Sequence, residues 1–189
     1  MNQSVEPSYA LVVKKDCPTC ALIEPVIAEL AEKMAGKLTI YVQDDPSFPA
    51  NSNPIDDRSL EFSYNNGIEI VPTLIDLSAG PEDRIYGWDK KQWREFTGIS
   101  SLGEGLVDFK PGCGSKTQDP GMDEVLALRF DSALLQARHV ELAESEDIME
   151  ACFERDWTDG LPVVPPTPIR VIRMLSGSDR PADEIIGNM

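Results

Sequence analysis

Three patterns of apolar positions follow one another at the start of the chain. The first run, residues 9–14, is apolar from 9 to 13, which predicts a strand buried on both faces. From Cys20 onward apolar residues recur at the spacing of one helix face, which predicts a helix over residues 18–35. Residues 38–42 are rich in β-branched and aromatic side chains, so we expect a second strand, parallel to the first and joined to it by a right-handed crossover.

The pattern continues with a short helix around residues 60–64. Residues 73–77 and 84–87 then predict an antiparallel hairpin, because a turn sequence with glycine and proline separates them. A helix over residues 89–97 closes the series. The order is β-α-β, α, β-β-α, which predicts an α/β fold with a mixed sheet.

The character of the sequence changes after residue 99. Residues 100–121 are rich in glycine and poor in apolar side chains, which predicts a loop or linker. Three further helices are expected at 123–138, 146–157 and 169–175. We therefore expect two domains, residues 1–100 and a loop-rich helical extension over 101–189. Because a segment with this much loop buries little surface by itself, we expect the extension to pack on the first domain or on another subunit.

Charge and cysteine content narrow the class of protein. The 189 residues carry a formal charge of −16, which excludes nucleic acid as a partner because phosphate binding needs clustered Lys and Arg. We find no signal-peptide pattern and no run long enough to span a bilayer, and we expect no membrane partner. Four cysteines without an export signal favour a reducing cytoplasm and catalytic rather than structural thiols.

Two of these cysteines, Cys17 and Cys20, stand where the first strand gives way to the helix. Pro18 suits the first helical position, so Cys17 should lie at the helix N-terminus. Free backbone N–H groups and the helix dipole favour a thiolate there, and Lys14 and Lys15 add positive charge. We expect Cys17 to be exposed and Cys20 to be more buried. The pair fits a redox dithiol, and the alternatives are half of a structural zinc site or inert thiols.

The Cys-Pro-Thr-Cys motif at 17–20 resembles the active-site motif of the thioredoxin superfamily. Pro25 lies five residues past the second cysteine, as is frequent in that family. The Ile-Val-Pro-Thr-Leu sequence at 70–74 resembles the family's cis-proline loop, and the Gly-Trp-Asp sequence at 87–89 resembles its ending. The resemblance covers residues 9–99 and implies a thioredoxin-like fold.

The resemblance also implies a chemistry for these residues. Cys17 would exchange with a substrate disulfide, Cys20 would resolve the mixed disulfide, and Pro72, after a cis Val71–Pro72 bond, would hold an extended substrate segment beside Cys17. The chain departs from the family at Leu11, where thioredoxins carry a buried acid.

The second half is similar to the segment that follows a thioredoxin-like module in larger bacterial proteins of the UGSC type. These are named for a selenocysteine-or-cysteine Gly-Ser-Cys motif, and the residues that carry the similarity are 111–116 and 157–167. The similarity implies that the native protein continues beyond Met189. Cys113 is then either a third redox thiol or an ordinary loop cysteine, since its motif ends in Lys116 instead of cysteine.

The sequence thus predicts a cytoplasmic enzyme, a thiol–disulfide oxidoreductase or redox carrier that works through Cys17 and Cys20. Its substrate would be a protein or small-molecule disulfide, and we expect no cofactor and no metal. Cys152 fits a buried small apolar residue. The alternative is a docking or assembly module that packs with a downstream domain or with itself, its cysteines non-catalytic or bound to a soft metal.

Overall fold

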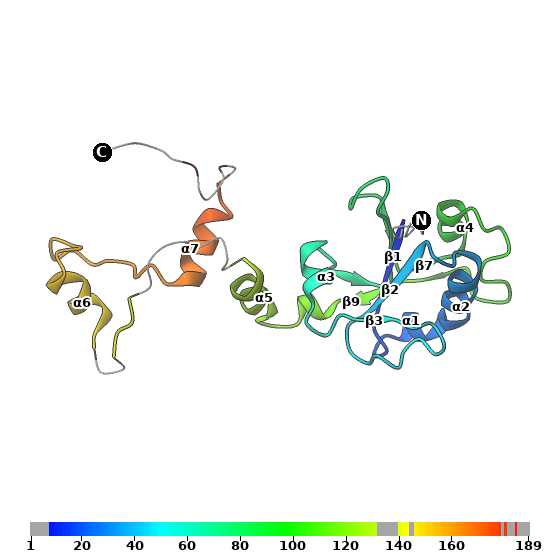
Figure 1. Cartoon of the computed structure of the whole chain (residues 1–189), viewed down its shortest axis with the longest axis horizontal. Helices are drawn as coiled ribbons and strands as arrows, with labels where there is room; N and C mark the ends of the chain where they lie inside the picture. Colours follow the sequence, from blue (N-terminus) through cyan, green and yellow to red (C-terminus); the bar gives the residue numbers. More distant parts are fainter. Residues whose placement is uncertain (1–7, 132–139, 144–145, 179, 181–183, 185–189) are drawn as a thin grey trace, which may run out of the picture. The chain divides into compact units, whose positions relative to one another are not determined.

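The computed structural model describes residues 8–131, 140–143, 146–178, 180 and 184. The chain divides into two compact units, Met1–Asp123 and Glu124–Met189 (Figure 1). The first unit contains the sheet and the cysteines Cys17, Cys20 and Cys113, and the second contains short helices.

The strands of the first unit are β1 (Tyr9–Val13), β2 (Leu38–Val42), β3 (Ile55–Asp56), β4 (Ile70–Val71), β5 (Thr73–Asp76), β6 (Arg84–Tyr86), β7 (Trp88–Asp89), β8 (Phe109–Lys110) and β9 (Cys113–Gly114). Its helices are α1 (Pro18–Leu22), α2 (Glu24–Lys33), α3 (Glu61–Asn65), α4 (Lys90–Thr97) and a single 3₁₀ turn, η1 (Lys116–Gln118). The helices α5 (Met122–Phe130), α6 (Ile148–Glu154) and α7 (Pro168–Leu175) follow.

Five strands form one mixed sheet in the order β3-β2-β1-β5-β6. β1 pairs in parallel with β2, as predicted for a crossover connection, and β2 pairs in parallel with β3. β5 runs antiparallel to both β1 and β6, which confirms the predicted hairpin. The chain is therefore an α/β protein, as the sequence predicts.

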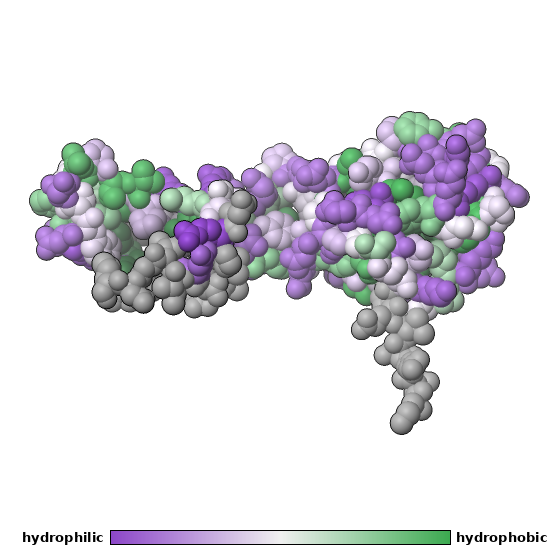
Figure 2. All heavy atoms as spheres, turned by 90° about the horizontal axis from the view of Figure 1, so that it is seen from above, coloured by the Kyte–Doolittle hydropathy of each residue, from purple (hydrophilic) through white to green (hydrophobic). Residues whose placement is uncertain are grey.

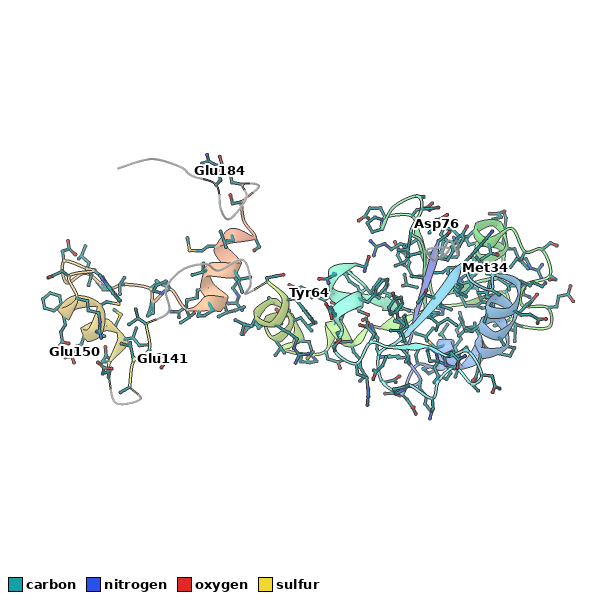
Figure 3. All side chains as sticks on the ribbon, in the orientation of Figure 1. Met34, Tyr64, Asp76, Glu141, Glu150 and Glu184 are labelled. Atoms are coloured by element: carbon teal, nitrogen blue, oxygen red, sulfur yellow. The ribbon has the colours of Figure 1, made fainter. Side chains whose placement is uncertain are left out.

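Helices cover both faces of this sheet, with α2 and α4 on one side and α3 on the other (Figure 1). Tyr9 of β1 meets Phe96 of α4 edge to face, and Tyr41 of β2 stacks on Phe62 of α3 with ring centroids 3.7 Å apart. Residues 10–13 of β1 have no exposed surface, so the prediction of a strand buried on both faces is confirmed. Met34, which caps α2 and is labelled in Figure 3, is also part of the core.

The helix predicted over residues 18–35 is two helices, α1 and α2, which meet at Ile23. Pro25 explains the break, because a proline has no N–H to donate and its ring clashes with the carbonyl four residues earlier. The apolar stripe continues across the break, and Ile23, Val26, Ile27 and Leu30 are all buried.

The prediction of a loop or linker over residues 100–121 is wrong for its second half. β8 pairs with β7 and β9 pairs with β4, so both strands belong to the first unit. That unit ends at Asp123, beyond the boundary expected at residue 100. Backbone pairing and two buried hydroxyl groups, those of Ser115 and Thr117, attach this segment to the first unit. Because this attachment does not depend on a row of apolar side chains, the sequence shows no apolar periodicity that would predict it.

In the second unit α6 lies within the helix predicted over 146–157, and α7 begins one residue before the helix predicted over 169–175, at Pro168. α5 covers the start of the predicted helix 123–138, and residues 132–138 lie outside the described part of the chain. Several apolar side chains of this unit are exposed, and Figure 2 shows apolar patches on its surface. None of the helices that the structure describes is long and apolar enough to cross a membrane.

Candidate thiol site

Cys17 lies at the N-terminus of α1, as the sequence predicts. Its backbone is extended (φ −143°, ψ 113°), and Pro18 occupies the first turn of the helix. The backbone N–H of Cys20 donates a hydrogen bond to the Cys17 sulfur, with N···Sγ 3.3 Å. The thiol therefore caps the helix, where a negative charge is stabilised by the free N–H groups.

A third cysteine, Cys113, comes to this position from 96 residues further along the chain. The Sγ atoms of Cys17 and Cys113 are 2.7 Å apart, which is longer than the ~2.05 Å of a disulfide bond. All three cysteines are free thiols in the structure. β9 positions Cys113 by pairing antiparallel with β4, where Cys113 stands opposite Val71. The structure thus brings together the three cysteines that the sequence analysis singled out for redox chemistry.

The expectation that Cys17 is exposed is wrong. Cys17 is only 1% exposed and Cys20 is fully buried, whereas Cys113 is partly exposed. The segment from Phe109 to Gly114 covers Cys17, and two further contacts hold this covering segment over the start of α1. The hydroxyl of Thr19 donates to the Pro111 carbonyl oxygen at 2.6 Å, and Lys110 Nζ donates to the Pro18 carbonyl oxygen at 3.2 Å.

The three thiols have different acidities. The pKa of Cys17 is lowered to about 5, chiefly because the Cys20 thiol hydrogen-bonds to the Cys17 thiolate. Burial opposes this, and the Cys113 thiol and the N–H groups of Cys20 and Thr19 reinforce it. Burial raises the pKa of both Cys20 and Cys113, and in each the hydrogen bond to Cys17 raises it further. These shifts favour a thiolate on Cys17 over one on Cys20 or Cys113.

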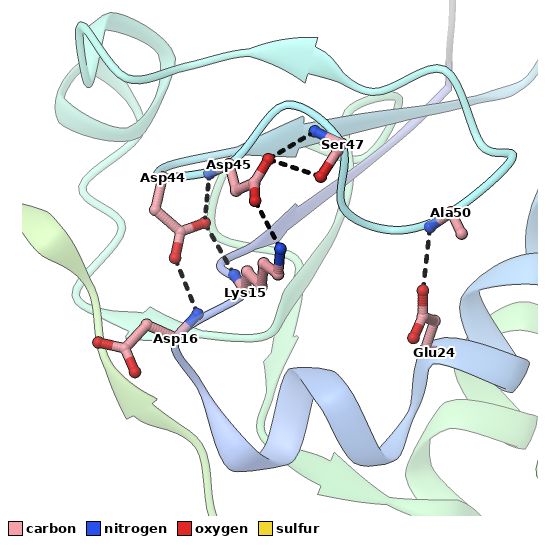
Figure 4. Close-up of polar contacts among 7 residues, drawn as sticks. All are labelled: Lys15, Asp16, Glu24, Asp44, Asp45, Ser47 and Ala50. Atoms are coloured by element: carbon pink, nitrogen blue, oxygen red, sulfur yellow. Dashed lines mark hydrogen bonds and ion pairs between the residues drawn. The ribbon is translucent and has the colours of Figure 1, made fainter.

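Lys15 contributes less to this thiolate than its position in the sequence suggests. Its ammonium forms an ion pair with Asp45, with Nζ···Oδ2 2.6 Å (Figure 4). Asp44 accepts the backbone N–H groups of Lys15 and Asp16, both at 2.8 Å. These carboxylates fix the loop that leads into α1. The ammonium of Lys116, the residue that ends the Cys113 motif, lies 3.9 Å from the Asp119 carboxylate.

Pro72 follows directly on the residue that pairs with Cys113. The Val71–Pro72 bond is cis, so that prediction is confirmed. The Cys17 sulfur lies 3.7 Å from the Val71 carbonyl oxygen, and the carbonyl oxygen of Pro72 accepts the N–H of Gly87 at 2.8 Å. Leu11 is fully buried in β1.

A buried polar network that the sequence analysis missed fixes the segment after Cys113. The Gln43 side chain, 1% exposed, donates to the hydroxyls of Ser63 and Ser115 at 2.8 and 2.7 Å. Its carbonyl oxygen accepts the backbone N–H of Lys116 at 3.1 Å. Thr117 also donates its hydroxyl to the Ile68 carbonyl oxygen. Polar residues at the end of one strand and in a distant loop carry no sequence pattern that would pair them.

Cys152 lies elsewhere, in α6 of the second unit, where it is 5% exposed. This agrees with the interpretation of Cys152 as a buried small apolar residue. Within the ranges that the structure describes, no group of three or more His, Cys, Asp or Glu side chains is placed to hold a metal ion.

Comparison of the chain with protein-family models, with curated proteins and with solved structures finds no match.

Proposed function

We propose that the first unit is a thioredoxin-like thiol–disulfide oxidoreductase whose redox dithiol is Cys17 and Cys20. One observation carries this proposal. The Cys17 sulfur caps a helix N-terminus, where the Cys20 N–H donates to it and a second, buried thiol lies one turn further along. The sheet order, and the contact of the Cys17 sulfur with the carbonyl oxygen of Val71, the residue before Pro72, support the family resemblance.

The acidities favour distinct roles for the two sulfurs. Cys17 is ionised at neutral pH and is therefore the nucleophile toward a disulfide. Cys20 keeps its proton until Cys17 is bound in a disulfide, because burial and the adjacent thiolate disfavour its ionisation. Cys20 then attacks the Cys17 sulfur, the bound thiol leaves with the proton, and a Cys17–Cys20 disulfide remains.

Equilibration with glutathione tests this proposal. Reduced protein is incubated in mixtures of glutathione and glutathione disulfide, quenched with acid, and mapped by mass spectrometry. We expect the Cys17–Cys20 disulfide to form in the wild type and to be absent in Cys17→Ser, and we expect Cys20→Ser to hold a long-lived disulfide at Cys17. Cys152→Ser is the matched control, because Cys152 is buried but belongs to the second unit. Absence of a Cys17–Cys20 disulfide in the wild type at every glutathione ratio would contradict the proposal.

A further inference from the structure

The reactive sulfur of this site is almost closed to solvent. Cys17 is 1% exposed, and the segment from Phe109 to Gly114 lies over it. A substrate disulfide approaching the unit therefore meets Cys113, the one partly exposed thiol of the three.

The covering segment is built into the unit. β8 and β9 each pair with a strand of the first unit, and Thr19 and Lys110 make the additional hydrogen bonds described above. Gly112 packs so closely that an added Cβ would stand 2.4 Å from the Ile70 Cγ2 atom and 2.9 Å from the Val71 carbonyl oxygen. Removing the segment from Cys17 would break all of these contacts together.

We propose that Cys113 is a third catalytic thiol, through which external thiols and disulfides exchange with Cys17. The proposal rests on the proposed function of the Cys17–Cys20 dithiol and adds the route by which electrons enter and leave it. The Cys17 and Cys113 sulfurs are 2.7 Å apart, so only a small displacement separates them from the ~2.05 Å of a disulfide bond.

The route is explicit for reduction of the oxidised protein by glutathione. A glutathione thiolate attacks the Cys113 sulfur of a Cys17–Cys113 disulfide, a glutathione–Cys113 bond forms, and the electron pair of the broken bond leaves on Cys17. A second glutathione attacks the glutathione sulfur of this mixed disulfide, glutathione disulfide leaves, and Cys113 takes a proton. Two glutathione thiols are oxidised and one protein disulfide is reduced.

Cys20 joins this route by an exchange without net oxidation. Its thiolate attacks the Cys17 sulfur, which releases Cys113 and gives the Cys17–Cys20 disulfide; the reverse step regenerates the Cys17–Cys113 form. The low pKa of Cys17 favours attack at Cys113, because the thiol of lower pKa is the better leaving group.

The test identifies the cysteine that first forms a mixed disulfide with glutathione. Oxidised wild type, Cys20→Ser and Cys113→Ser are mixed with reduced glutathione, quenched with acid after increasing times and mapped by mass spectrometry. We expect glutathione to appear first on Cys113 in the wild type and in Cys20→Ser. Reduction of oxidised Cys113→Ser should be slower by on the order of tenfold or more, because the two sulfurs that remain in the site, those of Cys17 and Cys20, need a local opening to be reached.

Glutathione appearing first on Cys17 or Cys20 in the wild type, or Cys113→Ser reacting as fast as the wild type, would overturn the route through Cys113. The equilibrium measurement separates this from failure of the proposed function. If Cys113→Ser still forms the Cys17–Cys20 disulfide at equilibrium and is reduced by glutathione as fast as the wild type, the proposed oxidoreductase function stands and the role of Cys113 does not. If neither the wild type nor Cys113→Ser forms that disulfide, both proposals fail.

Discussion

Hydrogen bonds set the charge of the Cys17 sulfur more than nearby cations do. The Cys20 thiol, the Cys113 thiol and two backbone N–H groups all favour the thiolate, and together they outweigh burial. Lys15, the cation next to the motif in sequence, forms an ion pair with Asp45 instead. A buried thiolate of this kind couples the stability of the reduced protein to pH.

The direction of this coupling follows from the two pKa values of Cys17. In the unfolded chain Cys17 titrates near its ordinary pKa of about 8.5, and in the folded chain near about 5. Between these values the unfolded state binds more protons, so folding becomes more favourable as pH rises. We predict that the free energy of unfolding of reduced wild type, relative to Cys17→Ser, increases from about pH 5 to about pH 8.5, by up to about 1.4 kcal/mol per pH unit.

Denaturant unfolding of both proteins at several pH values, with thiols kept reduced, measures this difference. Cys152→Ser should show the same pH dependence as the wild type, since Cys152 lies in the other unit. A difference between wild type and Cys17→Ser that stays constant across the interval would show that Cys17 is not a thiolate in the folded protein.

At the scale of secondary-structure elements, β9 can pair with β4 because two glycines allow the backbones to approach closely. Gly87 has φ +68°, and an added Cβ there would stand 2.7 Å from the backbone nitrogen of Gly112. Gly112 itself meets Ile70 and the Val71 carbonyl at similar range. The close approach of these backbones is what lets the segment reach over Cys17.

We therefore predict that Gly112→Ala displaces β9 and uncovers Cys17. Overpacking of this kind costs about 1–3 kcal/mol, which denaturant unfolding measures. Iodoacetamide should label Cys17 faster in the variant than in the wild type. The matched control is Gly114→Ala, two residues away in the same segment, because a Cβ there meets nothing within 4 Å. Equal labelling of Cys17 in the two variants would show that the segment does not control access.

At the scale of the whole molecule, the residues of the hydrophobic core cluster all lie between Tyr9 and Cys113. None of them comes from the second unit, which begins at Glu124. The three thiols and the segment that covers them also belong to the first unit. The first unit thus holds both its own core and the complete candidate site.

This leads us to predict that a fragment of residues 1–123 folds alone and keeps the thiol chemistry. Its denaturant midpoint and its rate of glutathione exchange should equal those of the full chain, because both depend on contacts inside the unit. Circular dichroism and the glutathione mapping described above measure the two properties. An unfolded fragment, or one that folds but has lost the Cys17–Cys20 disulfide, would show that the second unit contributes to the site.

The sequence alone determined the central strands of the first unit and the helix start at Cys17. The uninterrupted apolar run of β1 requires burial on both faces, and the helix spacing after Cys20 requires a partner surface for one face only. These local patterns sufficed for the parallel pair β1 and β2, the hairpin of β5 and β6, and the placement of Cys17 at a helix start.

Only the tertiary structure decided how the site is completed. Residues 109–117 attach through backbone pairing, glycine contacts and polar groups such as Gln43 and Ser115, none of which leaves a hydrophobic period in the sequence. The burial of Cys17 and its contact with Cys113 follow from that attachment. Local patterns report which face of an element avoids water, whereas a contact between sulfurs 96 residues apart depends on where whole elements dock.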